Sequence, residues 1–405
     1  MIFDIFFSIS QTEVDGIRPT ESHLFSNFFD QVQAADDLGF NTAWLAESHL
    51  SSEVQKLNPN PVIPHFKGEV GINVDFFQIS TRIFAKTKRL NTGSAIMNIL
   101  CNGGPIAAAE RVKSFLAFHQ LDPTEDRKIE VGFASGRFPY INHPYGIVPR
   151  NDLEKSIWGP VMVNLILKEA AEIFIRLIKG EILDTSDISQ PVLRSDDFRN
   201  PDDWQRLLTV FGKKSEQVEM DHHYHFNKLK IIPSDINIKR HLNLLIGSHD
   251  PRMQRFVNSL HPVGVFNLSI TSNATVEKTN EMMSEAYHSD GGKWTRDKMP
   301  RTVLVFINNN PKLTKSERIK AAQDNAKQTL SEYWKALEGT LDPVKVQQAE
   351  NNALIGDPEA IIAQMRERFN QADRLMLWFD FHNHNSTEVI NSMRSFMETV
   401  APEFK

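Results

Sequence analysis

The chain has 405 residues, of which 40% are hydrophobic and 24% are charged. This balance is typical of a globular protein with a large buried core. The formal net charge is −6, which argues against the basic surface that nucleic-acid binding requires, so we expect no nucleic-acid partner.

The sequence predicts neither a targeting segment nor a membrane span. The first ten residues are apolar but short, they lack a basic region, and they include Asp4. The most apolar long stretch, residues 157–178, is interrupted by charged side chains and is better explained as an amphipathic or buried helix. The single cysteine, Cys101, cannot form an internal disulfide, which fits a reducing compartment. We therefore expect a cytoplasmic protein.

Eight short apolar runs alternate with longer patterns of helical periodicity, which is the signature of repeated βαβ units. The expected strands are residues 2–8, 42–46, 92–98, 129–134, 242–247, 264–270, 302–307 and 374–381.

The expected helices begin and end at recognisable signals. Gly39 and Gly180 follow two helical patterns as C-terminal glycines, and Pro105 can occupy the first turn of another. Asp357 is an expected N-cap for the helix that starts at Pro358. Further helices are expected at 157–179, at 315 to about 337, and at 389–400.

Eight parallel strands joined by helices close most simply into a (β/α)₈ TIM barrel, with an open doubly wound sheet as the alternative. We expect one domain over residues 1–405, because no Pro/Gly-rich linker divides the chain. Two polar stretches, at about 184–229 and 272–300, are expected to be insertions.

In such a barrel the working residues follow the carboxyl ends of the strands. The strand ends supply these candidates: Ser8 and Ser10; Glu47, Ser48 and His49; Met97 and Asn98; Ser135, Gly136 and Arg137; Ser248; Thr271; Asn308; Asp380 and His382.

Two of these strand ends could bind a phosphate. At Ser135-Gly136-Arg137 a small turn would expose backbone N–H groups, and the guanidinium could add bidentate hydrogen bonds. At Ser248 a strand ends where a helix begins, and free N–H groups favour an anion. A helix cap at Ser248 and a surface salt bridge at Arg137 are the simpler alternatives.

Histidines occur in three places. His49 could act as a general base, or could be a structural histidine held by Glu47. The segment 221–225 contains three histidines, but no third ligand at a suitable spacing accompanies them, so we expect a solvated edge strand and no metal. His382 at the last strand end could touch a ligand.

Five runs in chain order resemble the bacterial-luciferase-like flavin monooxygenases, and together they cover most of the chain outside residues 184–220 and 272–300. These runs are AADDLGFNTAWLAESHL, LNTGSAIMNILCNGGPIAAAERV, EVGFASGRFP, HYHFNKLKIIPSDINIKRHLNLLIGSHDP, and the pair ALIGDPEAIIAQMRERF and LMLWFDFHNH.

The resemblance implies a two-component monooxygenase that takes reduced FMN from a separate NAD(P)H-dependent reductase. It implies dioxygen as co-substrate, an apolar or carrier-bound substrate of aldehyde or ketone type, and a homodimer. Carried over by position, Glu47, Ser48 and His49 would be catalytic. The residues expected to bind the cofactor are Ala95, Met97, Ser135, Gly136, Arg137 and Ser248.

Two departures leave other functions open. Ser48 stands where luciferase has a first histidine, and Ser135 stands where it has an arginine. A deazaflavin-dependent oxidoreductase on the same barrel is one alternative. A non-catalytic flavin-binding subunit is another, and the serine at position 48 is the feature that suggests it.

Overall fold

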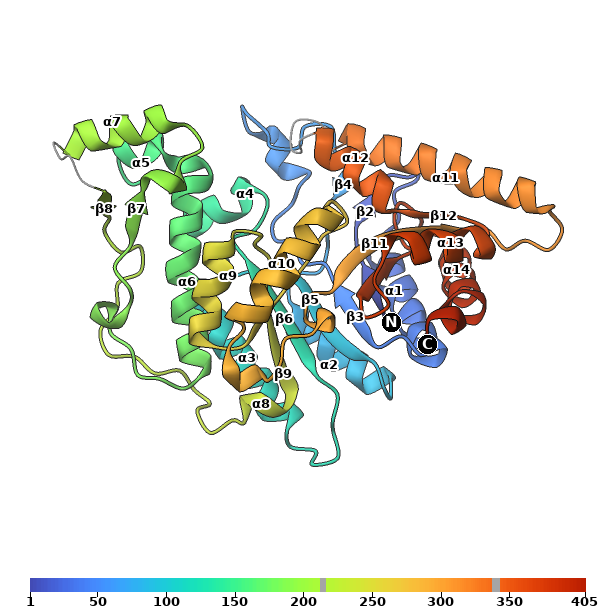
Figure 1. Ribbon diagram of the computed structural model, residues 1–405, viewed down its shortest axis with the longest axis horizontal. Coiled ribbons are helices and arrows are strands. Elements are labelled where there is room, and N and C mark those ends of the chain that lie inside the picture. Colours follow the sequence, from blue (N-terminus) through green and yellow to red (C-terminus); the bar gives the residue numbers. More distant parts are fainter. Residues whose placement is uncertain (212–215, 337–342) are drawn as a thin grey trace. The chain divides into compact units, whose positions relative to one another are not determined.

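The structure, a computed structural model, describes residues 1–211, 216–336 and 343–405. The chain divides into two compact units (Figure 1). The first comprises residues 1–97, 126–133 and 242–405, and the second residues 98–125 and 134–241. Whether the chain is one domain, as the sequence suggests, stays a prediction.

All eight expected strands form, and they pair in parallel around the first unit. They are β1 (Ile2–Phe7), β3 (Thr42–Leu45), β5 (Asn91–Asn98), β6 (Ile129–Ala134), β9 (Leu242–Ile246), β10 (Val263–Val265), β11 (Arg301–Ile307) and β13 (Arg374–Trp378). A short strand that the sequence analysis did not identify, β12 (Leu354–Gly356), pairs with β11.

The sheet closes into the predicted barrel. Its order is β10-β9-β6-β5-β3-β1-β13-β11, with β12 outside β11. Asn267, just after β10, pairs in parallel with Arg301 of β11 and thereby joins the two ends. Its N–H donates to Pro300 O and its carbonyl accepts from Thr302 N, both at 2.9 Å. The fold class is confirmed.

The barrel interior is filled in layers. The layer nearest the amino ends of the strands is ionic. In it, Arg374 contacts Asp4, Glu130 and Thr42. Above it lies an apolar layer formed by Phe6, Trp44, Leu245, Phe266 and Met376. Because side chains on a strand alternate between its two faces, Ser8 follows Asp4 and Phe6 on the inner face of β1. Polar groups therefore lie above the apolar layer, at the carboxyl ends of the strands.

The helices of the first unit include two that the sequence did not predict, at residues 273–286 and 343–352, and the last helix begins at Ser386 instead of the predicted residue 389. They are α1 (Glu21–Leu38), α2 (Phe76–Lys86), α9 (Pro251–Leu260), α10 (Asn273–Ala286), α11 (Lys315–Ala336), α12 (Pro343–Asn352), α13 (Pro358–Arg368) and α14 (Ser386–Thr399). Gly39 ends α1 with φ +83°, and the Asp357 side chain caps α13 by accepting from Ala360 N at 3.0 Å. The predicted end of the charged helix near Leu337 lies outside the described residues.

Some boundaries differ from expectation. β10 is shorter than the predicted 264–270, because Asn267 leaves the strand to make the closing contacts. The polar stretch 272–300 contains α10, whose N-cap is Ser272 and which packs on α9. A short antiparallel pair, β2 (Gln11–Thr12) and β4 (Gly68–Glu69), also forms.

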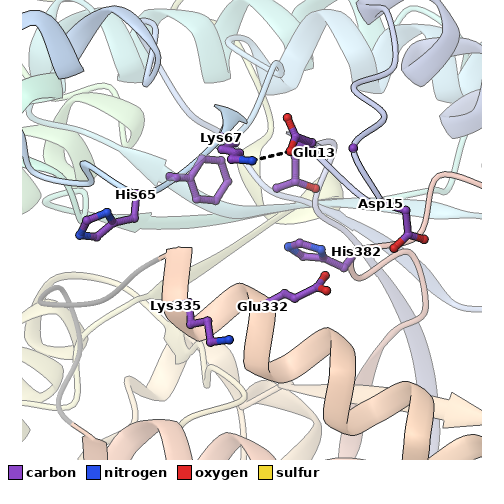
Figure 2. A pocket seen from close by; sticks show the side chains of 10 residues that line it. Glu13, Asp15, His65, Lys67, Glu332, Lys335 and His382 are labelled. Carbon is purple, nitrogen blue, oxygen red and sulfur yellow. Dashed lines mark hydrogen bonds and ion pairs between the residues drawn. The ribbon is translucent and has the colours of Figure 1, made fainter.

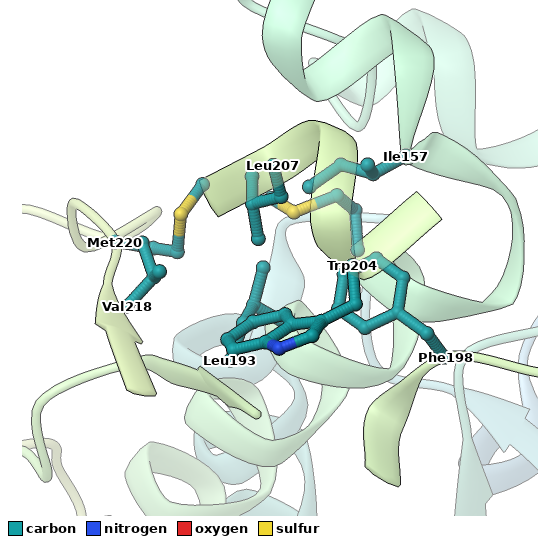
Figure 3. Packing of buried hydrophobic residues seen from close by; sticks show 8 residues of the cluster. Ile157, Leu193, Phe198, Trp204, Leu207, Val218 and Met220 are labelled. Atoms are coloured by element: carbon teal, nitrogen blue, oxygen red, sulfur yellow. The ribbon is translucent and has the colours of Figure 1, made fainter. Parts of the chain in front are cut away.

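The second unit has its own core (Figure 3). Its elements are α3 (Gly104–His119), α4 (Pro139–Asn142), α5 (Asp152–Ser156), α6 (Val163–Ile178), α7 (Pro201–Phe211), α8 (Ile238–His241) and the antiparallel pair β7 (Val192–Arg194) and β8 (Gln217–Glu219). The Trp204 and Leu207 side chains of α7 belong to one buried cluster with Leu193 of β7 and Val218 of β8. The predicted insertion at 184–229 thus folds around a hydrophobic cluster, although residues 212–215 lie outside the described part.

Two sequence expectations are corrected in this unit. The helix predicted at 157–179 is regular only from Val163, because Gly159 has a non-helical backbone; Gly180 follows the helix with φ +89°, as predicted. Residues 221–225 are not an edge strand. The Glu169 carboxylate accepts from the backbone N–H groups of His223 and Tyr224 at 2.9 and 3.1 Å, and these bonds hold the segment in an irregular conformation.

In the described parts of the chain, no helix is long and apolar enough to cross a membrane.

Candidate functional site

The residues after β3 form a buried, hydrogen-bonded group. His49 Nε2 lies 3.3 Å from Glu47 Oε1. The other carboxylate oxygen, Glu47 Oε2, accepts from Phe76 N at the start of α2 at 3.2 Å. Ser48 and His49 are 8% and 6% exposed. Glu47 therefore orients the imidazole, an arrangement that suits a structural histidine and a general base equally.

The two candidates on β5 differ in accessibility. Ala95 is half-buried, whereas Met97 is completely buried. The Ala95–Ile96 peptide bond is cis. Of the two, Ala95 is the residue with surface available to a ligand.

Ser248 lies between β9 and α9, as predicted, but the start of this helix already has an anionic cap. The Asp250 carboxylate accepts from Arg252 N at 2.9 Å. Ser248 Oγ accepts from Asp250 N at 3.3 Å. A phosphate at this helix start would have to approach the Asp250 carboxylate, which would repel it. The N-cap of α9 is therefore Asp250 and not Ser248, the residue that the sequence offered as the cap.

In the second unit, Gly136 follows β6 in the left-handed region, with φ +76°. A Cβ at this position would lie 2.2 Å from Asn98 Nδ2. Asn98 Nδ2 donates to Asn142 Oδ1 at 2.6 Å, and Asn142 Nδ2 donates to Ser135 O at 2.9 Å. The glycine thus has a local packing function that is independent of any cofactor. The Arg137 guanidinium lies 5.2 Å from the centre of the Phe138 ring.

A pocket of about 580 Å³ lies in the first unit (Figure 2). Its walls come from segments that follow β1, β3 and β13, and from α11, which follows β11; these four strands are adjacent in the sheet. The lining residues are Thr12, Glu13, Asp15, Gly16, His65, Phe66, Lys67, Glu332, Lys335 and His382.

The pocket contains several charged groups. Lys67 Nζ and Glu13 Oε1 form an ion pair at 2.6 Å. Figure 2 shows the His382 ring between this pair and Glu332. Burial lowers the pKa of His382 despite the opposing influence of Glu332, so the imidazole is neutral near pH 7. The lining therefore combines one internal ion pair with a neutral histidine that can both donate and accept.

Sequence reasoning identified one of these lining residues. His382 was a strand-end candidate, whereas the rest of the lining lies on loops and on α11, where no motif marks it. Conversely, none of the nine residues predicted to be catalytic or to bind the cofactor lines this pocket. The only available signal was positional, because the lining segments follow strands of the barrel.

A metal centre has no support within the described residues, because no group of three His, Cys, Asp or Glu side chains there is arranged to hold an ion.

Comparison with solved structures finds the same fold in flavin- and deazaflavin-dependent enzymes. The monooxygenase RslO1 from Streptomyces bottropensis is 16% identical, with all of both chains covered and a TM-score of 0.68. The oxygenating constituent of 3,6-diketocamphane monooxygenase from Pseudomonas putida, solved with FMN, is 12% identical, with 99% and 98% of the two chains covered and a TM-score of 0.59.

A third solved structure, an F420-dependent secondary alcohol dehydrogenase, is 14% identical, with 100% and 99% of the two chains covered and a TM-score of 0.56. No family model matches the chain. No curated protein matches it either. At these identities the likeness shows the fold alone, and it confirms that this chain has the same barrel fold as these enzymes.

Proposed function

We propose that this protein is a monooxygenase that uses reduced FMN and dioxygen to oxygenate an organic substrate. The main supporting observation is the buried Glu47–His49 pair at the carboxyl end of β3, where barrel enzymes place their working residues. The similar folds of RslO1 and of the diketocamphane monooxygenase component, which was solved with FMN, agree with this proposal.

The proposal gives the predicted residues separate tasks. Glu47 and His49 would hold or move a proton, and Ser48 would add a hydroxyl next to them. The flavin would supply the electrons and the site of dioxygen activation. The residues proposed to bind it are Ala95, Met97 and Ser248 in the first unit and Ser135, Gly136 and Arg137 in the second. Because Asp250 already caps α9, we propose that within the first unit the flavin phosphate is held by the Ser248 side chain and not by the helix N-terminus.

The proposal includes the partners that the sequence resemblance implies. A separate NAD(P)H-dependent reductase would supply the reduced FMN, and the chain would act as a homodimer in the cytoplasm.

Two alternatives use the same scaffold. The fold of the F420-dependent alcohol dehydrogenase favours a deazaflavin oxidoreductase as the second candidate. A non-catalytic flavin-binding subunit is the third, suggested by Ser48. Comparing the affinities for reduced FMN and for the reduced deazaflavin separates the first two. Oxygen transfer separates both enzymes from the third.

The test combines binding with isotope incorporation. Reduced FMN is titrated into the protein without oxygen, and ¹⁸O₂ is then admitted with a panel of aldehydes and ketones. We expect saturable binding and incorporation of one ¹⁸O atom into a product. No affinity for FMN in either redox state would refute the proposal.

A pair of histidine variants tests the role of His49. His49→Gln should lower the oxygenation rate about 10²- to 10⁴-fold, the usual contribution of a positioned acid or base, and should leave FMN affinity unchanged. The matched control is His23→Gln, because His23 is exposed on α1. Equal rates for the two variants would assign His49 a structural role only.

A further inference from the structure

The second unit exposes its most accessible apolar surface along one helix. Among its described residues, the three most exposed large hydrophobic side chains are Phe118, Leu121 and Ile232, at 72%, 78% and 75% exposure. Phe118 lies on α3 and Leu121 lies just beyond its end, while Ile232 lies on a segment beside the helix. Isolated exposed apolar residues are common, but several gathered on one element indicate an interaction surface.

The segment that contains Ile232 is held against α3 by hydrogen bonds. Lys113 Nζ donates to Ser234 O at 3.3 Å, and Gln120 Nε2 donates to Asn237 O at 2.8 Å. An open hollow lies between this segment and the helix. Its walls are formed by Glu110, Arg111, Ser114, Ile232 and Pro233.

The accessible residues of α3 form one stripe. Ala107, Arg111, Ser114 and Phe118 are half-buried or exposed. Their spacing of four, three and four residues places them on one side of the helix. The other side is buried, and α3 packs on α6. The stripe is therefore the side of α3 that the second unit leaves accessible.

Arg111 carries an unsatisfied charge within this stripe. Its Nε and Nη1 atoms are buried and have no hydrogen-bond partner among the described residues. Nη2 is not one of these buried atoms, and the side chain lines the hollow, so an acidic group seated there can reach the guanidinium. Because a partly buried cation without a counter-ion is costly, we expect a carboxylate from outside to complete this site.

The same helix supplies that carboxylate when two copies face each other. Glu110 is exposed and directly precedes Arg111, so opposite charges occupy adjacent positions in the hollow. In a twofold interface the contact of one residue with another is made twice, so these two residues can form two reciprocal ion pairs between copies. We propose that the stripe on α3 is the surface on which a second copy of this chain docks.

Side-chain sizes along the stripe fit the same arrangement. When two α3 helices lie antiparallel with the twofold axis between residues 112 and 113, Arg111 is level with the other copy's Ser114, and Phe118 with its Ala107. Each large side chain then faces a small one, which allows the helices to pack closely. Glu110 lies about 6 Å along the axis from the other copy's Arg111, which an arginine side chain can span.

Sedimentation velocity of the flavin-free, full-length chain over a range of concentrations tests the surface. We expect a dimer of 46.3-kDa chains. Arg111→Glu, or Glu110→Arg, should raise the dissociation constant at least about 100-fold, because like charges would then face each other. The variant that carries both changes should return to within about tenfold of the wild type, because opposite charges meet again. Single changes that dissociate the dimer without recovery in the double variant would overturn the reciprocal pairing.

A substitution away from the buried guanidinium tests the same surface. Phe118→Asp should keep the fold, because this side chain is 72% exposed, and it should raise the dissociation constant at least about tenfold. The matched control is Val210→Asp on α7, where the side chain is 66% exposed, and no change is expected. A dimer that resists Phe118→Asp, or that is equally sensitive to both variants, would overturn the inference.

The inference does not depend on the flavin chemistry, but it gives a position to the homodimer that the proposed function includes. A wild-type protein that stays monomeric would overturn this surface and the homodimer together, while the ¹⁸O measurement would still decide the oxygenation. A dimer that dissociates on Phe118→Asp but has no affinity for FMN would support the surface and refute the proposed function.

Discussion

Replacing Arg374 by methionine should destabilise the barrel severely, because Arg374 is the only cation in the ionic layer described at its base. Its Nε donates to Asp4 Oδ2 at 2.6 Å, and its Nη1 donates to Glu130 Oε2 at 2.9 Å. A second contact joins Nη2 to Glu130 Oε1. Trp44 Nε1 also donates to Asp4 Oδ2 at 2.6 Å. Without the guanidinium, two buried carboxylates would face each other inside the barrel.

The expected loss follows from the burial of this group. Asp4, Glu130 and Arg374 are 0%, 5% and 7% exposed. Removing one partner of a buried ion pair typically costs about 3–5 kcal/mol, because an uncompensated charge remains in a medium of low polarity. Methionine fills a similar volume, so the loss would be electrostatic rather than the result of a cavity.

The loss should depend on pH, with a definite sign. Burial already raises the pKa of Asp4 in the folded protein, which Arg374 partly offsets. Loss of the cation would raise this pKa further. A raised folded-state pKa means that ionisation costs stability as the pH rises through it. The deficit of Arg374→Met should therefore be largest near pH 8 and should shrink towards pH 5.

Equilibrium urea unfolding, followed by far-ultraviolet circular dichroism at pH 5 and pH 8, measures this difference. The control is Arg366→Met, which removes an exposed ion pair with Glu403 and should cost at most about 1 kcal/mol. A deficit below about 1 kcal/mol for Arg374→Met, or one that is equal at both pH values, would refute the assignment of this layer as a buried charge network.

Three smaller predictions concern single positions. Asp357→Ala removes the cap on Ala360 N and should lower the free energy of unfolding by about 1–2 kcal/mol, with an unchanged urea midpoint as the contrary result. Gly136→Ala would place a Cβ 2.2 Å from Asn98 Nδ2 at a positive φ, so thermal melting should show a loss of about 1–3 kcal/mol whether or not flavin is added. Asp380→Asn should stabilise the protein at pH 8 by up to about 2–3 kcal/mol. Burial raises the pKa of Asp380 to about 6 in the folded protein, so ionisation of this carboxyl destabilises the fold progressively from about pH 4 to about pH 6, and the full loss persists at higher pH. Parallel urea curves at pH 4 and pH 8 measure this gain, and an equal effect at both pH values would contradict it.

Hydrophobic periodicity was enough to locate the barrel strands, because burial on a strand or helix leaves its period in the sequence. The run 129–134 became β6 with the predicted bounds. Helix ends could be predicted equally well, because the contacts that form them are local. Gly39 ends one helix and Asp357 begins another through contacts with residues only a few positions away. Where a residue left its strand for a distant partner, as Asn267 did, the predicted boundary was wrong.

Part of the candidate site could also be predicted from local sequence. The pairing of Glu47 with His49 spans two residues, and it formed as the local spacing suggested. The cap that Asp250 provides is also local, yet its effect on a phosphate near Ser248 became evident only from the geometry.

By itself, the sequence determined the order and type of the barrel elements and the strand ends at which chemistry should be sought. The tertiary structure alone decided that Asp380 accepts from Ser8, a residue 372 positions away, and that His382 lines a pocket with Glu332 and Lys67. The physical reason is that hydrophobic periodicity reflects how each residue is buried within its own helix or strand. A pocket depends instead on which distant loops converge. Contacts between residues so far apart in the chain leave no local pattern in the sequence.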